Sequence, residues 1–600
     1  MIKDFNTLNE FFNTEDKEVT TNDFVRTYGF GEVNDGGSGL YKVKSLSASE
    51  PGANIFNGFD VTCGGCTLEL IPENGTVRVE QFGIAANCDF ENMTAKEKTE
   101  LLFKNKNAIQ AAVDSGASRV EFSPGTYYVA EDILIDHPVD IVGNGAKLVL
   151  ETDSTSTQLF RVEYAVDAAI SNASISDMTI EGTHTITQEQ VADPETNETE
   201  TVDKITNYNH CINLNNVTDY TISGVNFEYG NYAIYVSDSK NIIVENCVCD
   251  DVTKALYFSN TSTIKMKNVK AKMVSVGSQG LIIMGNTNNV IVEDVSITNA
   301  IIALFVHDIS WSDEKKATDR ILFKNLLVDK ADTVAWFRNT YIPVCFSNAM
   351  FVDIKKACFI LTKAENISVN NSSVLLAAPA DCAANAAPIY ISGATKIKFT
   401  HAQFEFPCNL QLTLYDHFHW GDIDVGFVDC TIQKTDIACV EGVEDPIGFG
   451  VIGYAASVTD SFTETFDACE FRSYIQNYSA DNMPVVLSAP NNSDSKLIIK
   501  NCRFVNDSTC TVPYFKLDDS AKFDNIVVYN CFFENYEFSK GEGEDKHYPI
   551  FGRVVDGAIN TDNTDSGGEK IHNIFARCNM RSSAPDRTNG TTINEMLEYI

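Results

Sequence analysis

The chain has 600 residues, 44% of them hydrophobic, and a formal net charge of −38. So acidic a chain disfavours nucleic acid and anionic membrane surfaces as partners, because both are bound through clustered Lys and Arg; it disfavours a polyanionic sugar unless a cation mediates. No apolar stretch approaches a membrane span and the start lacks the pattern of a secretion signal, so we expect no membrane insertion and synthesis in a cytoplasm without a signal peptide.

Residues 1–78 form the first predicted region. It opens with a predicted short helix over Phe5–Phe12 and continues with a strand, a glycine-rich turn at residues 34–39 and a second strand. Its Cys63-Gly-Gly-Cys66 segment has neither a second Cys-x-x-Cys pair nor a nearby His. We therefore interpret this segment as structural, rather than as half a zinc site or a redox pair.

Residues 79–118 are predicted to be a connector and a capping helix. Residues 107–113 have helical spacing and high helix propensity, and Gly116 follows as a terminating glycine. The open end of a stack of strands must be covered to prevent aggregation, and an amphipathic helix is a common cover.

A short pattern, apolar-x-apolar-x-Asn-small, organises the next region and predicts a parallel β-solenoid over residues 119–580. Its second apolar position steps by 22 residues, from Ile222 to Val244 to Met266. A period of that length with strand alternation is typical of coils that bury their apolar faces by stacking on one another. The Asn suits a sharp turn, because it tolerates the left-handed backbone conformation better than other residues with a Cβ.

Later turns are expected at eight further positions: Asp294, Asn325, Asn348, Asn371, His401, Asp429, Asn501 and Asn530. Many of the 17 cysteines occupy the small inward position after the turn, where we expect buried thiols in different coils and no disulfide framework: Cys247, Cys430, Cys469, Cys502, Cys531 and Cys578. The polar segment 184–209 is expected to be an exposed loop, and further loops are expected at 311–319, 416–424 and 534–548. In the tail, residues 581–600, residues 593–598 are expected to form one or two helical turns.

The segments Gln81-Phe82-Gly83, 107–112 and Phe122–Tyr127 together resemble the beginning of the pectate-lyase-like right-handed parallel β-helix superfamily. The Asp35–Tyr41 element, joined to them by Val77–Gly83, looks like the virion-proximal part of bacteriophage tailspikes and preneck appendages. This resemblance implies an all-β, right-handed parallel β-helix with a capping helix and a small N-terminal virion-attachment domain. It also implies a homotrimer in the virion tail, made in the host cytoplasm, that contacts other tail proteins through its N-terminal region and binds bacterial surface polysaccharide.

An outward aromatic stripe is the first candidate for binding sugar. If Ile234, Leu256, Ile282 and Leu304 point inward, alternation points their successors outward: Tyr235, Tyr257, Ile283 and Phe305. Exposed aromatic stripes serve as sugar-stacking platforms or bury against a partner subunit, and both roles stay open. Lesser candidates are Trp311, beside Asp308 and Asp313, and Trp336 with Arg338.

The candidate catalytic residues lie together in the segment 415–424. It holds Asp416, His417, His419, Asp422 and Asp424, which could share general acid and base work, and Trp420, which could stack a sugar. An ordinary polar loop is the alternative, and a His-x-His spacing is weak evidence for a metal, so no cofactor is expected apart from an optional calcium ion. Asp308 and Asp416 lie about four coils apart by register, roughly 19 Å at about 4.8 Å per coil, which is too far for a glycosidase pair.

The active sites of enzymes with this fold are not matched. Polygalacturonase-like hydrolases carry Asn-Thr-Asp, Asp-Asp and Gly-His-Gly in that order, whereas here Asp250-Asp251 precedes 560–562 and Gly-His-Gly is missing. Three functions stay open: a tail appendage that binds and perhaps degrades host polysaccharide, a polysaccharide lyase or hydrolase outside any virion, and a purely structural tail component.

Overall fold

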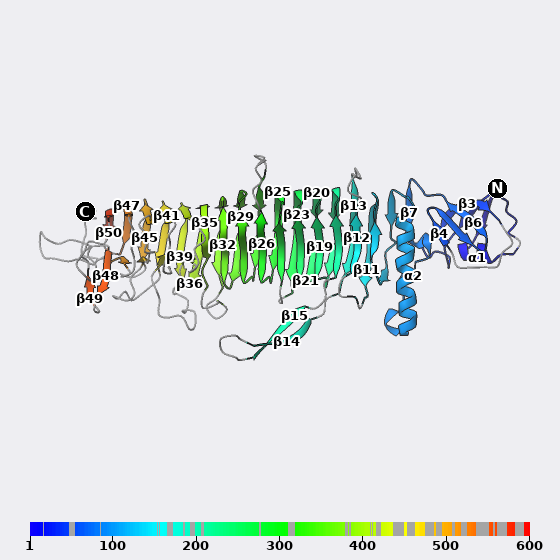
Figure 1. Cartoon of the computed structure of the whole chain (residues 1–600), viewed down its shortest axis with the longest axis horizontal. Coiled ribbons are helices and arrows are strands. Elements are labelled where there is room, and N and C mark those ends of the chain that lie inside the picture. Colours follow the sequence, from blue (N-terminus) through cyan, green and yellow to red (C-terminus); the bar gives the residue numbers. More distant parts are fainter. Residues whose placement is uncertain are drawn as a thin grey trace. The chain divides into compact units, whose positions relative to one another are not determined.

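The computed structural model of the chain (Figure 1) falls into two compact units, residues 1–281 and 282–600, each described by itself. The described residues are 1–15, 17–46, 55–84, 86–152, 154, 157–164, 172–183, 186–192, 199–205, 209–274, 278–309, 319–377, 382, 386–407, 410, 412–415, 422–435, 449–452, 462–473, 485–487, 495–506, 510–517, 525–535, 551–555, 558–560, 573–581 and 593–599. Within these ranges no helix is long and apolar enough to cross a membrane.

The first unit begins with a six-stranded sheet. Its strands, in spatial order, are β1 (Ile2–Phe5), β2 (Phe24–Thr27), β3 (Gly39–Ser45), β6 (Cys66–Leu70), β5 (Asp60–Cys63) and β4 (Ile55–Asn57). The predicted helix over Phe5–Phe12 begins later, as α1 (Leu8–Asn13), because Ile2–Phe5 pairs with β2 and Thr7 caps the helix. Cys63 and Cys66 face each other across a two-residue turn whose glycines both have positive φ, and both thiols are buried and form no disulfide bond.

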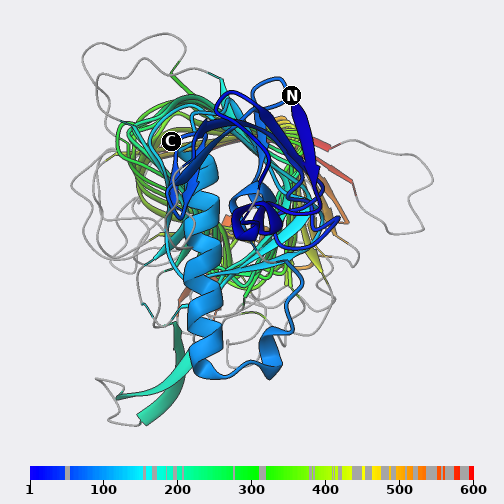
Figure 2. The same cartoon turned by 90° about the vertical axis from the view of Figure 1, so that its right-hand side faces the viewer.

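A connector and a long helix follow. The connector contains β7 (Thr76–Arg78) and the short 3-10 helices η1 (Val79–Phe82) and η2 (Phe90–Asn92), and the helix is α2 (Ala95–Val113). The helix starts twelve residues before the predicted 107–113, because Thr94 and Glu97 form a capping box that stabilises an earlier start. It contacts η1, β9 (Thr126–Val129) and β10 (Ile133–Ile135) (Figures 1 and 2).

The rest of the first unit consists of stacked coils, each of which contributes one strand to each of three parallel sheets. The first sheet contains β10, β12 (Gln158–Glu163), β16 (His210–Asn215), β19 (Tyr232–Ser237) and β22 (Lys254–Ser259). The second contains β7, β8 (Arg119–Glu121), the starts of β11 (Asp140–Leu150) and β13 (Ala173–Glu181), β17 (Thr218–Ser223), β20 (Lys240–Glu245) and the start of β23 (Ser262–Met273). The third contains β9, the ends of β11, β13 and β23, β18 (Asn226–Glu228) and β21 (Val248–Val252).

The 22-residue step is the repeat of the coil. Ile222 aligns with Val244 and Val244 with Met266 on neighbouring strands, and all three side chains are fully buried. The turn residues that follow, Asn246 and Asn268, have positive φ. The predicted fold class, a right-handed parallel β-helix with a capping helix, is confirmed.

The polar segment 184–209, predicted to be an exposed loop, contains two strands. Its described part is an antiparallel hairpin of β14 (Ile186–Ala192) and β15 (Thr199–Ile205), which stands away from the coils in both views (Figures 1 and 2). Both stretches contain β-branched Ile, Val and Thr residues among their polar residues, and these favour strands. The prediction of a loop considered only the polarity of the segment.

The second unit continues the same coil plan; β24 (Gln279–Met284) straddles the boundary between the units. Its first sheet contains β26 (Ile302–Ile309), β29 (Thr333–Thr340), β32 (Ala357–Glu365), the start of β35 (Ile389–Thr400) and β37 (Thr413–Tyr415). Its second contains the start of β25 (Asn288–Thr298), β27 (Ile321–Lys324), β30 (Val344–Ser347), β33 (Ile367–Asn370), the end of β35, β38 (Ile423–Val428), β41 (Phe462–Asp467), β44 (Ser495–Lys500) and the starts of β47 (Asn525–Glu534) and β50 (Asn573–Arg581).

Its third sheet contains the end of β25, β28 (Leu327–Asp329), β31 (Met350–Ile354), β34 (Ser373–Leu376), β36 (Gln403–Pro407), β39 (Thr431–Thr435), β42 (Glu470–Ser473), β45 (Arg503–Asn506) and the ends of β47 and β50. A separate sheet contains β40 (Phe449–Ile452), β43 (Val485–Leu487), β46 (Phe515–Leu517), β48 (Phe551–Val555) and β49 (Ala558–Asn560). The helical turns predicted in the tail are wrong, because Ile593–Tyr599 forms β51, antiparallel to β50.

The corners and core of the second unit match the repeat. All eight predicted turn residues from Asp294 to Asn530 have positive φ. Cys430, Cys469, Cys502 and Cys531 are buried thiols on successive coils and form no disulfide bonds; the side chain of Cys578 lies outside the described residues. Phe427 stacks between Phe399 and Phe466, with ring centroids 5.0 and 4.7 Å apart, so the interior forms columns of like side chains.

Candidate functional site

An aromatic cluster on the first sheet of the first unit is the best-built candidate for binding a ligand. Tyr235 and Tyr257 are Cα partners on β19 and β22, and both are half-buried. Their rings stack 4.5 Å apart with 8° between the planes. The inward neighbours Ile234 and Leu256 are buried, as predicted, so alternation does point the two tyrosines outward.

A second column of side chains lies beside the tyrosine pair. His210, Tyr232 and Lys254 are aligned on β16, β19 and β22. Lys254 Nζ donates to Tyr232 Oη at 3.0 Å and lies 4.6 Å from the centre of that ring. His210 packs 4.6 Å from Tyr232 and 5.2 Å from Tyr235. Burial, and then the nearby Lys254 charge, lowers the pKa of His210 to about 4, so this imidazole is neutral at neutral pH.

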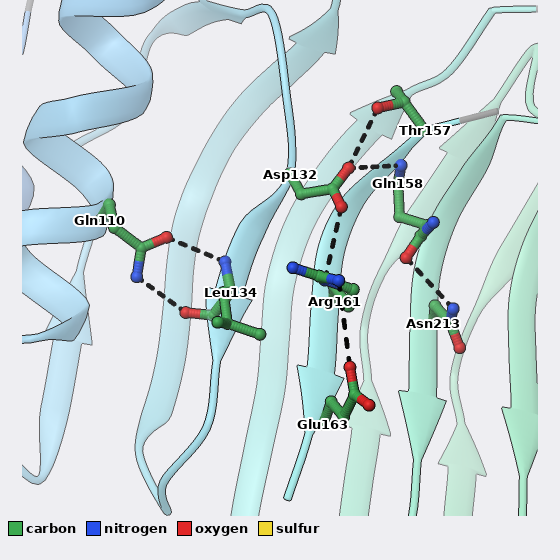
Figure 3. A network of polar contacts seen from close by, with 8 residues as sticks. All are labelled: Gln110, Asp132, Leu134, Thr157, Gln158, Arg161, Glu163 and Asn213. Atoms are coloured by element: carbon green, nitrogen blue, oxygen red, sulfur yellow. Dashed lines mark hydrogen bonds and ion pairs between the residues drawn. The ribbon is translucent and has the colours of Figure 1, made fainter. Parts of the chain in front are cut away.

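Polar side chains extend the cluster toward α2 (Figure 3). Asn213 and Arg161 continue the column of Tyr235 on the two preceding strands, and Asn213 Nδ2 donates to Gln158 Oε1 at 3.2 Å. Arg161 Nε lies 3.4 Å from Asp132 Oδ2, an ion pair that lacks hydrogen-bond geometry, and its Nη1 lies 4.0 Å from Glu163. The face therefore joins flat aromatic surface to hydrogen-bonding groups, which is the composition of a sugar-binding surface.

Hydrogen bonds hold the residues that lie beside Arg161 and behind this face in place. Asp132 Oδ1 accepts from Thr157 Oγ1 and from the Gln158 backbone, both at 3.0 Å. Gln110 on α2 clamps the backbone of Leu134, accepting from its N–H and donating to its carbonyl at 2.9 Å each (Figure 3). The helix thus holds the first strand of the sheet in place.

The second unit carries another aromatic group on its own first sheet. Phe305 and Trp336 are Cα partners with ring centroids 5.1 Å apart, and the ring of His307 stacks on Phe305 at 4.2 Å. Arg338, exposed, aligns with His307 on the next strand. Ile283 was predicted to point outward, but its side chain is fully buried.

The predicted catalytic segment is only partly described. Asp416, His417, His419 and Trp420 lie outside the described residues, and so does Trp311. Asp422 and Asp424 are exposed, and Asp424 stands on β38 in the second sheet. Phe305, Trp336 and Arg338 belong to the first sheet, so the structure does not bring Asp424 onto their face. Across the described ranges, no three His, Cys, Asp or Glu side chains gather closely enough to hold a metal ion.

His210, Tyr232 and Lys254 were missed by the sequence reasoning. Strict alternation along β19 predicts that the side chain of residue 233 points outward, as that of Tyr235 does. Ala233 and Ile234 are instead both buried, so the outward side chain before Tyr235 is that of Tyr232, three residues earlier. The signal that could have found these residues is the 22-residue period itself, which aligns Tyr232 with Lys254.

Comparisons with known proteins were made at the levels of family, sequence and structure. Residues 194–376 match the family model NosD, described as a periplasmic copper-binding protein, which is less than half of the chain. No curated protein matches.

Solved structures share the coil architecture at low similarity. Tailspike protein 3 of bacteriophage CBA120 is 10% identical with a TM-score of 0.37, covering 74% of this chain and 61% of that one. Tailspike gp49 of Pseudomonas phage LKA1 is 12% identical with a TM-score of 0.35, covering 80% and 84%. The A-module of the Azotobacter vinelandii mannuronan C-5 epimerase AlgE6 is 11% identical with a TM-score of 0.31, covering 77% and 94%. At this similarity the likeness carries no functional argument.

Proposed function

We propose that the chain is a phage tail appendage of the tailspike type, which binds a bacterial surface polysaccharide through the first sheet during adsorption. The observation that carries the proposal is the stacked pair Tyr235 and Tyr257, half-buried and flanked by Lys254, Asn213 and Arg161. A sugar ring packs on an aromatic face while its hydroxyls take hydrogen bonds from neighbouring polar groups. A purely structural tail component has no need of such a face.

The virion assignment rests on the resemblance of Asp35–Tyr41 and Val77–Gly83 to the virion-proximal part of tailspikes. These segments belong to the N-terminal sheet domain and to its connection with the first coil. The proposal therefore assigns attachment to other tail proteins to residues 1–78. It assigns contact with the host to the first sheet. It includes a homotrimer and a location in the virion tail.

Binding to purified capsular and O-antigen polysaccharides tests the proposal. We expect Tyr235→Ala and Tyr257→Ala each to weaken binding about 5-fold, because an aromatic contact contributes about 1 kcal/mol. Tyr529→Ala is the matched control, since Tyr529 is 42% exposed and stands on β47 in the second sheet of the second unit. Equal binding by all three variants would contradict the assignment of this face, and no binding by the wild-type chain would favour a structural component.

The rival function, a polysaccharide lyase or hydrolase outside any virion, is distinguished by location. Antibodies against the chain should label purified virions of the phage that encodes it. Labelling confined to the culture supernatant would favour the free enzyme.

A further inference from the structure

The outward face of β23 is basic, although the chain as a whole is strongly acidic. Four exposed lysines alternate with buried residues along this strand: Lys265, Lys267, Lys270 and Lys272. Lys272 pairs with Asp250 at 2.9 Å and with Asp251 at 3.4 Å. The other three form no ion pair within the part of the chain that the structure describes. One strand of the first unit therefore presents three ammonium groups to the outside.

Two exposed apolar side chains lie beside these lysines on the preceding coil. Ile243 is the Cα partner of Lys265, and it is 37% exposed. Val248 is the Cα partner of Lys270, and it is 40% exposed. We call these four residues the basic-apolar strip. Each of its two pairs sets an aliphatic side chain next to a lysine, which suits a partner surface that is both apolar and acidic.

The hairpin of β14 and β15 carries the opposite charge. Residues 186–205 contain six acidic residues and one lysine, a formal charge of −5. Among the strands that the structure describes, the two pair only with each other, and the hairpin stands away from the coils in both views (Figures 1 and 2). A two-stranded hairpin is at best marginally stable in water by itself, so it gains from packing on another surface.

One face of this hairpin has a pattern that complements the basic-apolar strip. Glu189 is the Cα partner of Val202. Two residues further along β14, Val191 is the Cα partner of Glu200. Positions two residues apart share a face of a strand, so these four residues lie on the same face of the hairpin. Each pair joins an aliphatic residue to an acid, as each pair of the strip joins an aliphatic residue to a lysine.

The net charge favours a second copy of the chain as the partner. Two copies with a charge of −38 repel each other unless their contact brings a basic surface against an acidic one. The strip and the hairpin are such surfaces, and every copy carries both. A contact between two different surfaces of one chain is head-to-tail, and it gives a closed ring such as a trimer when the rotation between copies closes.

We propose that the hairpin of one copy docks on the basic-apolar strip of a second copy, with the acids of β14 and β15 facing the lysines of β23. The inference deepens the proposed function, because it rests on the homotrimer included there and names the surfaces that meet. Exposed ion pairs add little affinity, so the charges select the partner surface, and the aliphatic contacts of Ile243 and Val248 hold it.

Charge reversal on each side tests the contact, with the mass of the purified full chain from sedimentation equilibrium as the readout. Lys265→Glu/Lys270→Glu should raise the concentration needed for half-assembly at least about 10-fold, because acids would then face acids. Glu189→Lys/Glu200→Lys should do the same, because lysines would face lysines. The chain with all four substitutions should assemble as the wild type does, since every contact is then reversed on both sides.

Lys398→Glu/Lys496→Glu is the matched control. Both lysines are exposed on the second sheet of the second unit, and neither forms an ion pair with a residue that the structure describes. This variant changes the net charge as much as the variant of the strip does, but it leaves the strip and the hairpin intact. It should assemble as the wild type does, and circular dichroism should show the wild-type spectrum for every variant.

The outcomes separate this inference from the proposed function. A trimer that both reversed variants still form, or a chain with all four substitutions that does not assemble, would overturn the inference and leave the homotrimer standing. Assembly lost only in the variant of the strip would mean that another acidic surface occupies it, which also overturns the inference. A wild-type chain that stays monomeric would overturn both the inference and the homotrimer, while polysaccharide binding tests the rest of the proposed function.

Discussion

The corner residues show at the residue scale why the repeat could be read from the sequence. A left-handed backbone conformation costs about 1–2 kcal/mol for most residues with a Cβ, and Asn or Gly reduces that cost. Gly224, Asn246 and Asn268 occupy the same corner on successive coils, all with positive φ. Asn268 Nδ2 also donates to Asn246 Oδ1 at 2.8 Å, so each corner supports the next.

Substitution of Asn246 tests this account. Asn246→Val should lower the free energy of unfolding by about 1–2 kcal/mol, because a β-branched residue is strained in that conformation. Asn246→Gly should cost less than about 1 kcal/mol, since Gly224 already fills the equivalent corner and glycine adopts positive φ freely. Chemical denaturation of both variants measures the difference; equal losses would show that the conformation does not set the choice of residue.

His210 makes stability depend on pH. Its pKa falls from an ordinary 6.5 to about 4 in the folded chain, through burial and Lys254, and Asp132 opposes this only weakly. Between these values the unfolded chain binds a proton that the folded chain does not, so stability is lost as pH falls from 6.5 to 4. The loss is up to about 3 kcal/mol.

His210→Gln removes this titration. Thermal unfolding of the wild type and of His210→Gln should therefore converge as the pH falls from 7 to 4. Parallel curves would mean that His210 is as easily protonated in the folded chain as in the unfolded one.

At the scale of the element, the sequence predicted which helices and strands form better than it predicted the residues at which they begin and end. The helix over 107–113 was correctly expected, but α2 begins at Ala95, because the capping box of Thr94 and Glu97 stabilises a start that propensity alone does not reveal. The strands of the first sheet were expected to alternate, but a buried pair such as Ala233 and Ile234 shifts the outward positions by one. That shift places Tyr232 on the same face as Tyr235, which an alternation of period two does not predict.

At the scale of the whole molecule, the proposed assembly has a measurable mass. The chain weighs 66.1 kDa, so a homotrimer would weigh about 198 kDa, three times that value. If the proposed homotrimer is a closed, permanent assembly, sedimentation equilibrium of the purified full chain should give the trimer mass over the accessible concentration range. A mass of one chain at all concentrations would contradict the trimer.

The sequence by itself determined the coil. Stacking requires the same residue type at the same place in every turn, so the pattern through Ile222, Val244 and Met266, the turn residues and the inward cysteines are all visible as a period. The candidate sites do not repeat one residue type from coil to coil, although Tyr235 and Tyr257 follow the same 22-residue step. They arise where residues distant in the chain become neighbours on adjacent strands, as His307 and Arg338 do, and only the register of the folded coils decides which side chains meet.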